Sequence, residues 1–139
     1  MTNKELHQKT KSVAVKYLQI ESELVALLIE IDSRRAYKDL GYASLFQYSV
    51  SELGLSEAVT AAFITVSRKA AVVPELMLAL EEQTLTVSKA AKIVSALDVQ
   101  SAPEIIEYAA AHSTAQTEKW LKEKQGIETW VGDELGKSS

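Results

Sequence analysis

Two groups of basic residues are the part of this sequence best suited to bind a charged ligand. Arg34, Arg35 and Lys38 form the first group, and Arg68 and Lys69 form the second. Guanidinium and ammonium groups donate hydrogen bonds to phosphate oxygens and neutralise their charge. The sequence therefore offers two candidate contacts to a phosphate backbone. The first group also lies near the predicted C-terminal end of a helix, where positive charge stabilises the helix dipole without any ligand.

Residues that usually carry catalysis or bind metals are sparse in this chain. It has no cysteine, and neither His7 nor His112 has a second ligand at metal-binding spacing. Adjacent carboxylates such as Glu81 and Glu82 diverge by about 100° on a helix and cannot flank one bond. We therefore expect no catalytic residue, no metal site and no cofactor, and we predict that the protein is not an enzyme.

The composition favours a helical protein of the cytoplasm. Only five glycines and two prolines interrupt 139 residues, and 47% of the residues are hydrophobic. No apolar run is long enough for a signal peptide or a membrane span, and the lack of cysteine suits a reducing compartment. The net charge is −4, with the excess of acidic residues in the second half. Any contact to nucleic acid would therefore need a local basic patch.

A long amphipathic helix is predicted from about Ser12 to Lys38, ending before Gly41. Its apolar residues recur every three or four positions and so lie on one face. We call this face the seam; its residues are Val13, Tyr17, Ile20, Leu24, Leu27 and Ile31. Such a seam forms either the spine of a helical bundle or a coiled-coil contact to a second copy of the chain. We favour the spine and keep a homodimer through this helix as the alternative.

Capping signals predict six further helices. Ser44, Ser56 and Thr86 (or Thr84) can each accept a hydrogen bond at a helix start, and Ser101 with Glu104 resembles a capping box. The expected helices cover about residues 44–53, 56–73, 75–83 and 87–97, one that Ser101 opens, and one from Ser113 or Thr114 to about Lys124. The fold class is all-α, a bundle of about seven helices. We expect one domain over 1–139, with an ordered core at 12–124 and flexible ends at 1–11 and 127–139.

Gly54 separates two of these predicted helices in a manner typical of a helix-turn-helix. The segment from Ser56 to Val73 would then be the recognition helix. Reading DNA requires exposed donors on that helix, and Ser56 and Thr65 are its suitable outward residues. The candidate nucleic-acid-binding residues are Arg34, Arg35, Lys38, Ser56, Thr65, Arg68 and Lys69. The alternative is a helix whose small residues let a neighbouring helix approach closely.

Short motifs mark the ends and starts of the predicted helices. They lie at Arg34 to Tyr48, Glu52 to Glu57, Pro74 to Leu76, Leu85 to Ser88, Ser101 to Glu104 and Ser113 to Glu118. Together they resemble the N-terminal helical region of bacterial HNH endonucleases. That region has a paired-basic helix end, a Leu-Gly-Tyr-Ser-Ser-Leu turn, a Leu-Ser-Glu helix, a Pro-Glu helix and a short helix that Leu-Ser or Leu-Thr opens. The resemblance covers roughly residues 12–124.

This resemblance implies a non-catalytic, bacterial-type accessory module that binds or targets double-stranded DNA. The nuclease of the family lies in a ββα unit with metal-binding His and Asn residues, and this chain lacks that unit. The segment from Ala61 to Ser67 also lacks the arginines that the family usually carries there. An alternative function is therefore a self-associating protein-interaction module that does not bind DNA.

Overall fold

The protein is built of helices that follow one another through short connections. The computed structural model describes the backbone of residues 1–137 and the side chains of residues 1–126, and this part contains no strand. The elements in order are α1 (Asn3–Arg34), α2 (Ala36–Asp39), α3 (Leu45–Ser51), α4 (Glu57–Val72), α5 (Pro74–Glu81), α6 (Val87–Ile93), the 3-10 helix η1 (Val94–Ala96), α7 (Ala102–Ala111) and α8 (Thr114–Lys137). The all-α prediction with a long N-terminal helix is confirmed.

Both ends of α1 differ from the prediction. The helix begins at Asn3 because the Glu5 N–H donates a hydrogen bond to Thr2 Oγ1 at 3.1 Å, which caps the first turn. It ends at Arg34, because Arg35 adopts the left-handed conformation with φ 53° and donates its N–H to Asp32 and Ile31. The predicted bounds of Ser12 and Lys38 are therefore wrong. Residues 3–11, which we expected outside the ordered core, are helical.

The caps of three later helices are confirmed. Ser44, Ser56 and Thr86 each accept a hydrogen bond from the backbone N–H three residues onward, at the starts of α3, α4 and α6. The predicted capping box at Ser101 is wrong. The Ser101 hydroxyl instead donates to Ala96 O at 3.1 Å, and Glu104 forms an ion pair with Lys124.

The last helix is longer than predicted. We expected it to end near Lys124, but the backbone of α8 continues as helix to Lys137. We also predicted a flexible end at residues 127–139. The side chains of 127–139 and the backbone of 138–139 lie outside the described part of the structure.

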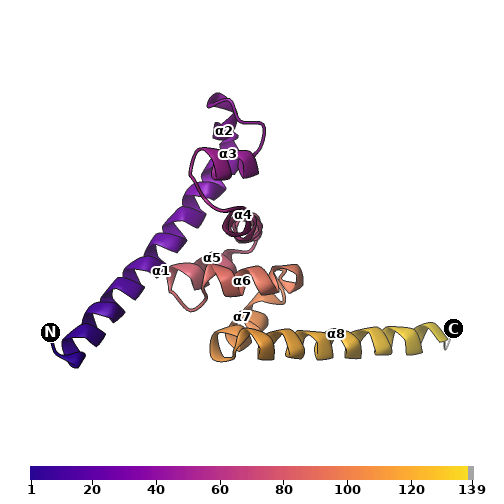
Figure 1. The fold of residues 1–139 in the computed structure, drawn as a ribbon. Coiled ribbons are helices and arrows are strands. Elements are labelled where there is room, and N and C mark those ends of the chain that lie inside the picture. Colours follow the sequence, from indigo (N-terminus) through magenta and orange to yellow (C-terminus); the bar gives the residue numbers. More distant parts are fainter. Residues whose placement is uncertain (138–139) are drawn as a thin grey trace.

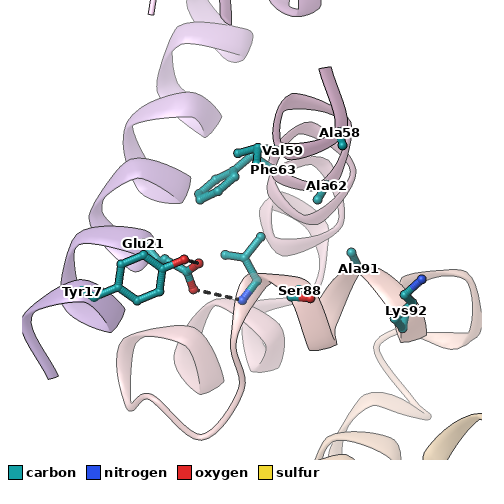
Figure 2. A pocket seen from close by; sticks show the side chains of 10 residues that line it. Tyr17, Glu21, Ala58, Val59, Ala62, Phe63, Ser88, Ala91 and Lys92 are labelled. Atoms are coloured by element: carbon teal, nitrogen blue, oxygen red, sulfur yellow. Dashed lines mark hydrogen bonds between the residues drawn. The ribbon is translucent and has the colours of Figure 1, made fainter. Parts of the chain in front are cut away.

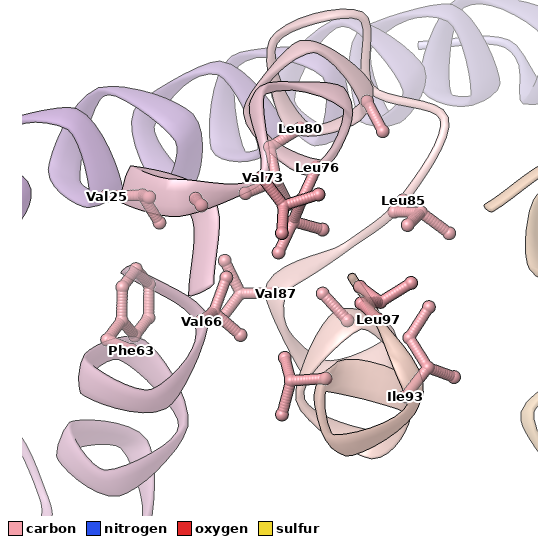
Figure 3. Close-up of a cluster of buried hydrophobic side chains, with 14 of the residues drawn as sticks. Val25, Phe63, Val66, Val73, Leu76, Leu80, Leu85, Val87, Ile93 and Leu97 are labelled. Atoms are coloured by element: carbon pink, nitrogen blue, oxygen red, sulfur yellow. The ribbon is translucent and has the colours of Figure 1, made fainter. Parts of the chain in front are cut away.

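The hydrophobic core forms around α4, which contacts α1, α3, α5 and α6. Figure 3 shows side chains of α1, α4, α5 and α6 gathered in this core. Fully or almost fully buried members are Val25 and Leu28 of α1, Val66 of α4, Leu76 and Leu80 of α5, and Val87 and Ile93 of α6. Helices α7 and α8 join this core through α5 and α6. In Figure 1 the N-terminal part of α1 and the C-terminal part of α8 project from the body in different directions.

Three buried hydroxyl groups lack a hydrogen-bond partner among the described residues, which is unusual for buried polar atoms. They are Ser49 Oγ on α3, and Thr60 Oγ1 and Ser67 Oγ on α4. An unpaired buried hydroxyl loses its hydration and gains nothing in return. These residues therefore lower the stability of the core.

We predict that replacing Leu28 with Ala lowers the free energy of unfolding by about 2–5 kcal/mol, because it leaves a cavity where a fully buried side chain was. The control is Leu40→Ala, since Leu40 carries the same side chain but is 60% exposed and lies outside α1. Urea denaturation measures both. Equal losses would contradict the burial of Leu28.

We predict that Thr60→Val raises the free energy of unfolding by about 1 kcal/mol, because it removes an unpaired buried hydroxyl at nearly constant volume. Thr117→Val is the control, as Thr117 is equally buried but its hydroxyl donates to Ser113 O at 2.9 Å. Thermal melts should shift upward for the first variant and downward for the second. A loss of stability in both would mean that Thr60 has a partner.

Candidate interaction surface

Helix α1 carries two apolar faces, and the body of the protein covers one of them. Ser22, Val25 and Leu28 are buried against the other helices. Successive residues lie about 100° apart around a helix, so Leu27 points well away from Leu28. Most of the seam is exposed: Val13 is 56%, Tyr17 60%, Ile20 60% and Leu27 59% accessible. Only Leu24 and Ile31 of the seam are partly covered by the core.

The interpretation of the seam as the spine of the bundle is therefore wrong from Val13 to Ile20 and at Leu27. The residues that anchor α1 lie on the neighbouring face, which the heptad spacing of the seam did not identify. Because the helix starts at Asn3, the seam also extends backward to Leu6, which is 54% exposed. Sequence analysis missed Leu6, although the cap at Thr2 and Glu5 could have indicated the earlier start.

The N-terminal half of α1 has almost no contact with the rest of the chain. Every residue from 1 to 17 is exposed, and Figure 1 shows this segment extending beyond the body. An isolated helix as short as residues 3–17 is only marginally stable in water. An exposed apolar stripe on such a segment is typical of a surface that binds another protein.

A groove adjoins the seam where α1 meets α4 and α6 (Figure 2). It has a volume of about 370 Å³, and small residues such as Ala58, Ala62 and Ala91 leave it open. Tyr17 lines this groove and also belongs to the seam. The apolar surface therefore continues from the projecting helix onto the body.

Glu21 fixes the position of α1 beside the groove. Its carboxylate accepts hydrogen bonds from Tyr17 Oη at 2.9 Å and from the Val87 N–H at 3.2 Å. The second bond caps the N-terminus of α6 from another helix. The hydrogen bond to Glu21, with the negative charge of that carboxylate, raises the pKa of the Tyr17 phenol. The tyrosine is therefore neutral at physiological pH and can be covered at lower cost than a charged group.

The second basic group of the predicted nucleic-acid site is engaged within the protein. The Arg68 guanidinium forms an ion pair with Asp32 at 3.2 Å. Lys69 Nζ donates to Leu97 O at 2.9 Å, and this contact is partly buried. Both cations would have to leave these partners to bind phosphate fully.

The first basic group lies at the end of α1 and in the following turn. Arg34 pairs with Glu30 one turn earlier, whereas Arg35 and Lys38 are exposed. The ion pair between Arg68 and Asp32 brings the two basic groups to the same end of α1. Acidic partners accompany both groups there and reduce their attraction for phosphate.

The two polar residues of the predicted nucleic-acid site, Ser56 and Thr65, make hydrogen bonds within α4 and its N-terminal cap. The Ser56 hydroxyl accepts a hydrogen bond from the Val59 N–H at 3.2 Å and caps α4. Thr65 Oγ1 donates to Ala61 O at 2.8 Å in the previous turn and is exposed. Helices α3 and α4 contact each other, as a helix-turn-helix requires. The proposed role of these residues in reading DNA stays a prediction.

No protein-family model matches the sequence, and no curated protein or solved structure is significantly similar to it. The resemblance to the helical region of HNH endonucleases therefore stays a prediction. In the described residues, no helix is long and apolar enough to cross a membrane. In the same part of the chain, no three His, Asp or Glu side chains converge in a way that could hold a metal ion.

We predict that Lys69→Met lowers the free energy of unfolding by about 1 kcal/mol, because the hydrogen bond to Leu97 O is lost while the aliphatic stem remains. Lys38→Met is the control, since Lys38 is exposed. Denaturant titrations should separate the two variants. Equal stability would indicate that the Lys69 ammonium is solvated and available to a ligand.

Proposed function

We propose that the chain is a non-catalytic protein-interaction module that associates with a second copy of itself through α1. The observation that carries this proposal is the seam: a row of apolar residues with coiled-coil spacing, most of which its own chain leaves exposed. With Leu6 included, the seam runs to Ile31 and spans more than three heptads. This length is sufficient for a specific two-helix contact.

The apolar surface is large enough to support association. Fully burying an aliphatic or aromatic side chain contributes roughly 1.5–3 kcal/mol, so covering a half-exposed one contributes about 1 kcal/mol. Five seam residues are more than half exposed in each copy, and they are Leu6, Val13, Tyr17, Ile20 and Leu27. Two copies together would gain about 10 kcal/mol, against an association cost of about 4–15 kcal/mol. A dimer that forms in a concentration-dependent manner is expected.

A DNA-binding accessory module, the function that the family resemblance implies, has less support from the geometry. In its second basic group, Arg68 is paired with Asp32 and Lys69 donates to Leu97 O. In its first basic group, Arg34 is paired with Glu30. The remaining exposed cations of that site are Arg35 and Lys38. The interaction module requires no rearrangement, because its surface is already exposed.

We predict that Ile20→Lys weakens self-association by at least about 100-fold, since a charge would face the apolar seam in both copies. The fold should remain intact because Ile20 is 60% exposed in the single chain. Sedimentation equilibrium over a wide concentration range measures the effect, and circular dichroism verifies the helix content.

The control variant is Gln19→Lys, which places the same charge on the same helix but outside the seam. It should associate like the wild type. A wild-type protein that stays monomeric at near-millimolar concentration would contradict the proposed function.

A further inference from the structure

The charges beside the seam are ordered along α1. In heptad terms, Thr10, Tyr17, Leu24 and Ile31 occupy one seam position, and Leu6, Val13, Ile20 and Leu27 occupy the other. The residues that directly precede the first set form one flank of the seam, and we call it the outer flank. Its members are Lys9, Lys16, Glu23 and Glu30. Two positive charges in the N-terminal half are thus followed by two negative charges in the C-terminal half.

The opposite flank of the seam faces the body of the protein. Its later members are already engaged there: Glu21 accepts the Val87 N–H, and Leu28 is fully buried. All four residues of the outer flank are exposed. Glu30 also pairs with Arg34 on its own helix, through side chains that are both largely exposed. The outer flank is therefore the side on which charges of two copies can meet.

We propose that two copies associate with their α1 helices antiparallel; this inference rests on the proposed self-association. In an antiparallel coiled coil, the two outer flanks face each other. If Tyr17 lies opposite Ile20 of the partner subunit, then Lys9 faces Glu30 of the partner subunit. In the same register Lys16 faces Glu23 of the partner subunit. Two-fold symmetry repeats both pairs, so every charge of the outer flank meets its opposite.

A parallel dimer does not match the charges in this way. There the outer flank of one copy meets the body-facing flank of the other. Lys9 would face Ala14 of the partner subunit, and Glu23 would face Leu28 of the partner subunit, which is buried. Two opposite-charge pairs remain: Lys16 would face Glu21 of the partner subunit, which already caps α6, and Glu30 would face Arg35 of the partner subunit, which lies beyond the end of α1. Exposed ion pairs contribute little affinity individually, but their complementarity fixes the orientation of the partners.

The position of the body is compatible with the antiparallel arrangement. Each body is attached to the C-terminal half of its own α1, and the N-terminal half projects (Figure 1). In an antiparallel pair, each projecting half covers the seam beside the body of the other copy. The two bodies are then attached at opposite ends of the helix pair.

Spin labels on the full chain test the orientation, because the absence of cysteine lets a single introduced thiol carry the label. For Gln8→Cys, an antiparallel dimer offsets the labels by roughly 20 residues along the axis, or about 30 Å, whereas a parallel dimer places them at the same level and so closer together. For Gln19→Cys, the labels lie near the two-fold axis and close together in either orientation.

A long distance for Gln8→Cys with a short one for Gln19→Cys is the expected result. Short distances at both positions would overturn the antiparallel arrangement and leave the proposed function standing. No dipolar coupling at either position would contradict self-association itself, and with it this inference.

Charge reversal gives an independent test at low salt. The double variant Lys9→Glu/Lys16→Glu and the double variant Glu23→Lys/Glu30→Lys should each self-associate about tenfold or more weakly than the wild type, because like charges then face each other. An equimolar mixture of the two should form a heterodimer, and the quadruple variant should recover the wild-type affinity. Unchanged association of the double variants would overturn the pairing of the outer flanks.

Discussion

The orientation of α1 about its own axis determines which apolar residues this chain can bury. The helix has two apolar faces, and the body covers only one of them because α4 and α5 pack against the side that carries Val25 and Leu28. Both side chains are fully buried there. The seam, on the adjacent face, is left to solvent or to another molecule. The orientation of α1 therefore determines both which of its residues join the core and which of its apolar residues are exposed.

Polar contacts also hold α1 in that orientation, although an exposed ion pair contributes less than the burial of Val25 and Leu28. Glu21 caps α6 through the Val87 N–H, and Asp32 pairs with Arg68 of α4. Both carboxylates lie on the same side of α1 as Val25 and Leu28, since residues three to four apart share a face. Rotation of α1 to bury the seam would break both contacts and expose Leu28. The exposure of the seam is thus part of the fold, and not a consequence of a missing core residue.

This arrangement also explains why the two functional hypotheses differ in their support. Phosphate binding would draw Arg68 and Lys69 away from contacts that join α4 to α1 and to the loop after η1. Association through the seam uses side chains that make few contacts in the single chain. Arg68 and Lys69, which connect the helices, are therefore poor candidates for ligand binding. The seam residues make few such contacts and are better candidates for binding a partner.

The sequence by itself determined the helical class, the starts of α3, α4 and α6, and the presence of a heptad seam. These features depend on neighbours a few residues apart: a serine or threonine cap, a proline at the first turn of α5, and a spacing of three and four. The C-terminal end of α1 could not be predicted from the sequence. Arg35 ends the helix in a left-handed conformation that non-glycine residues seldom adopt, and only the tertiary context favours it.

Tertiary structure alone decided which face of α1 is buried and which cations are paired. The seam and the face with Val25 and Leu28 both have apolar residues at helical spacing. The periodicity therefore could not show which of the two faces is buried. The choice depends on which helices approach, and these come from parts of the chain more than 30 residues away, as the pair Asp32 and Arg68 illustrates. Contacts at such separation have no signature in a local pattern, because they depend on the path of the whole chain.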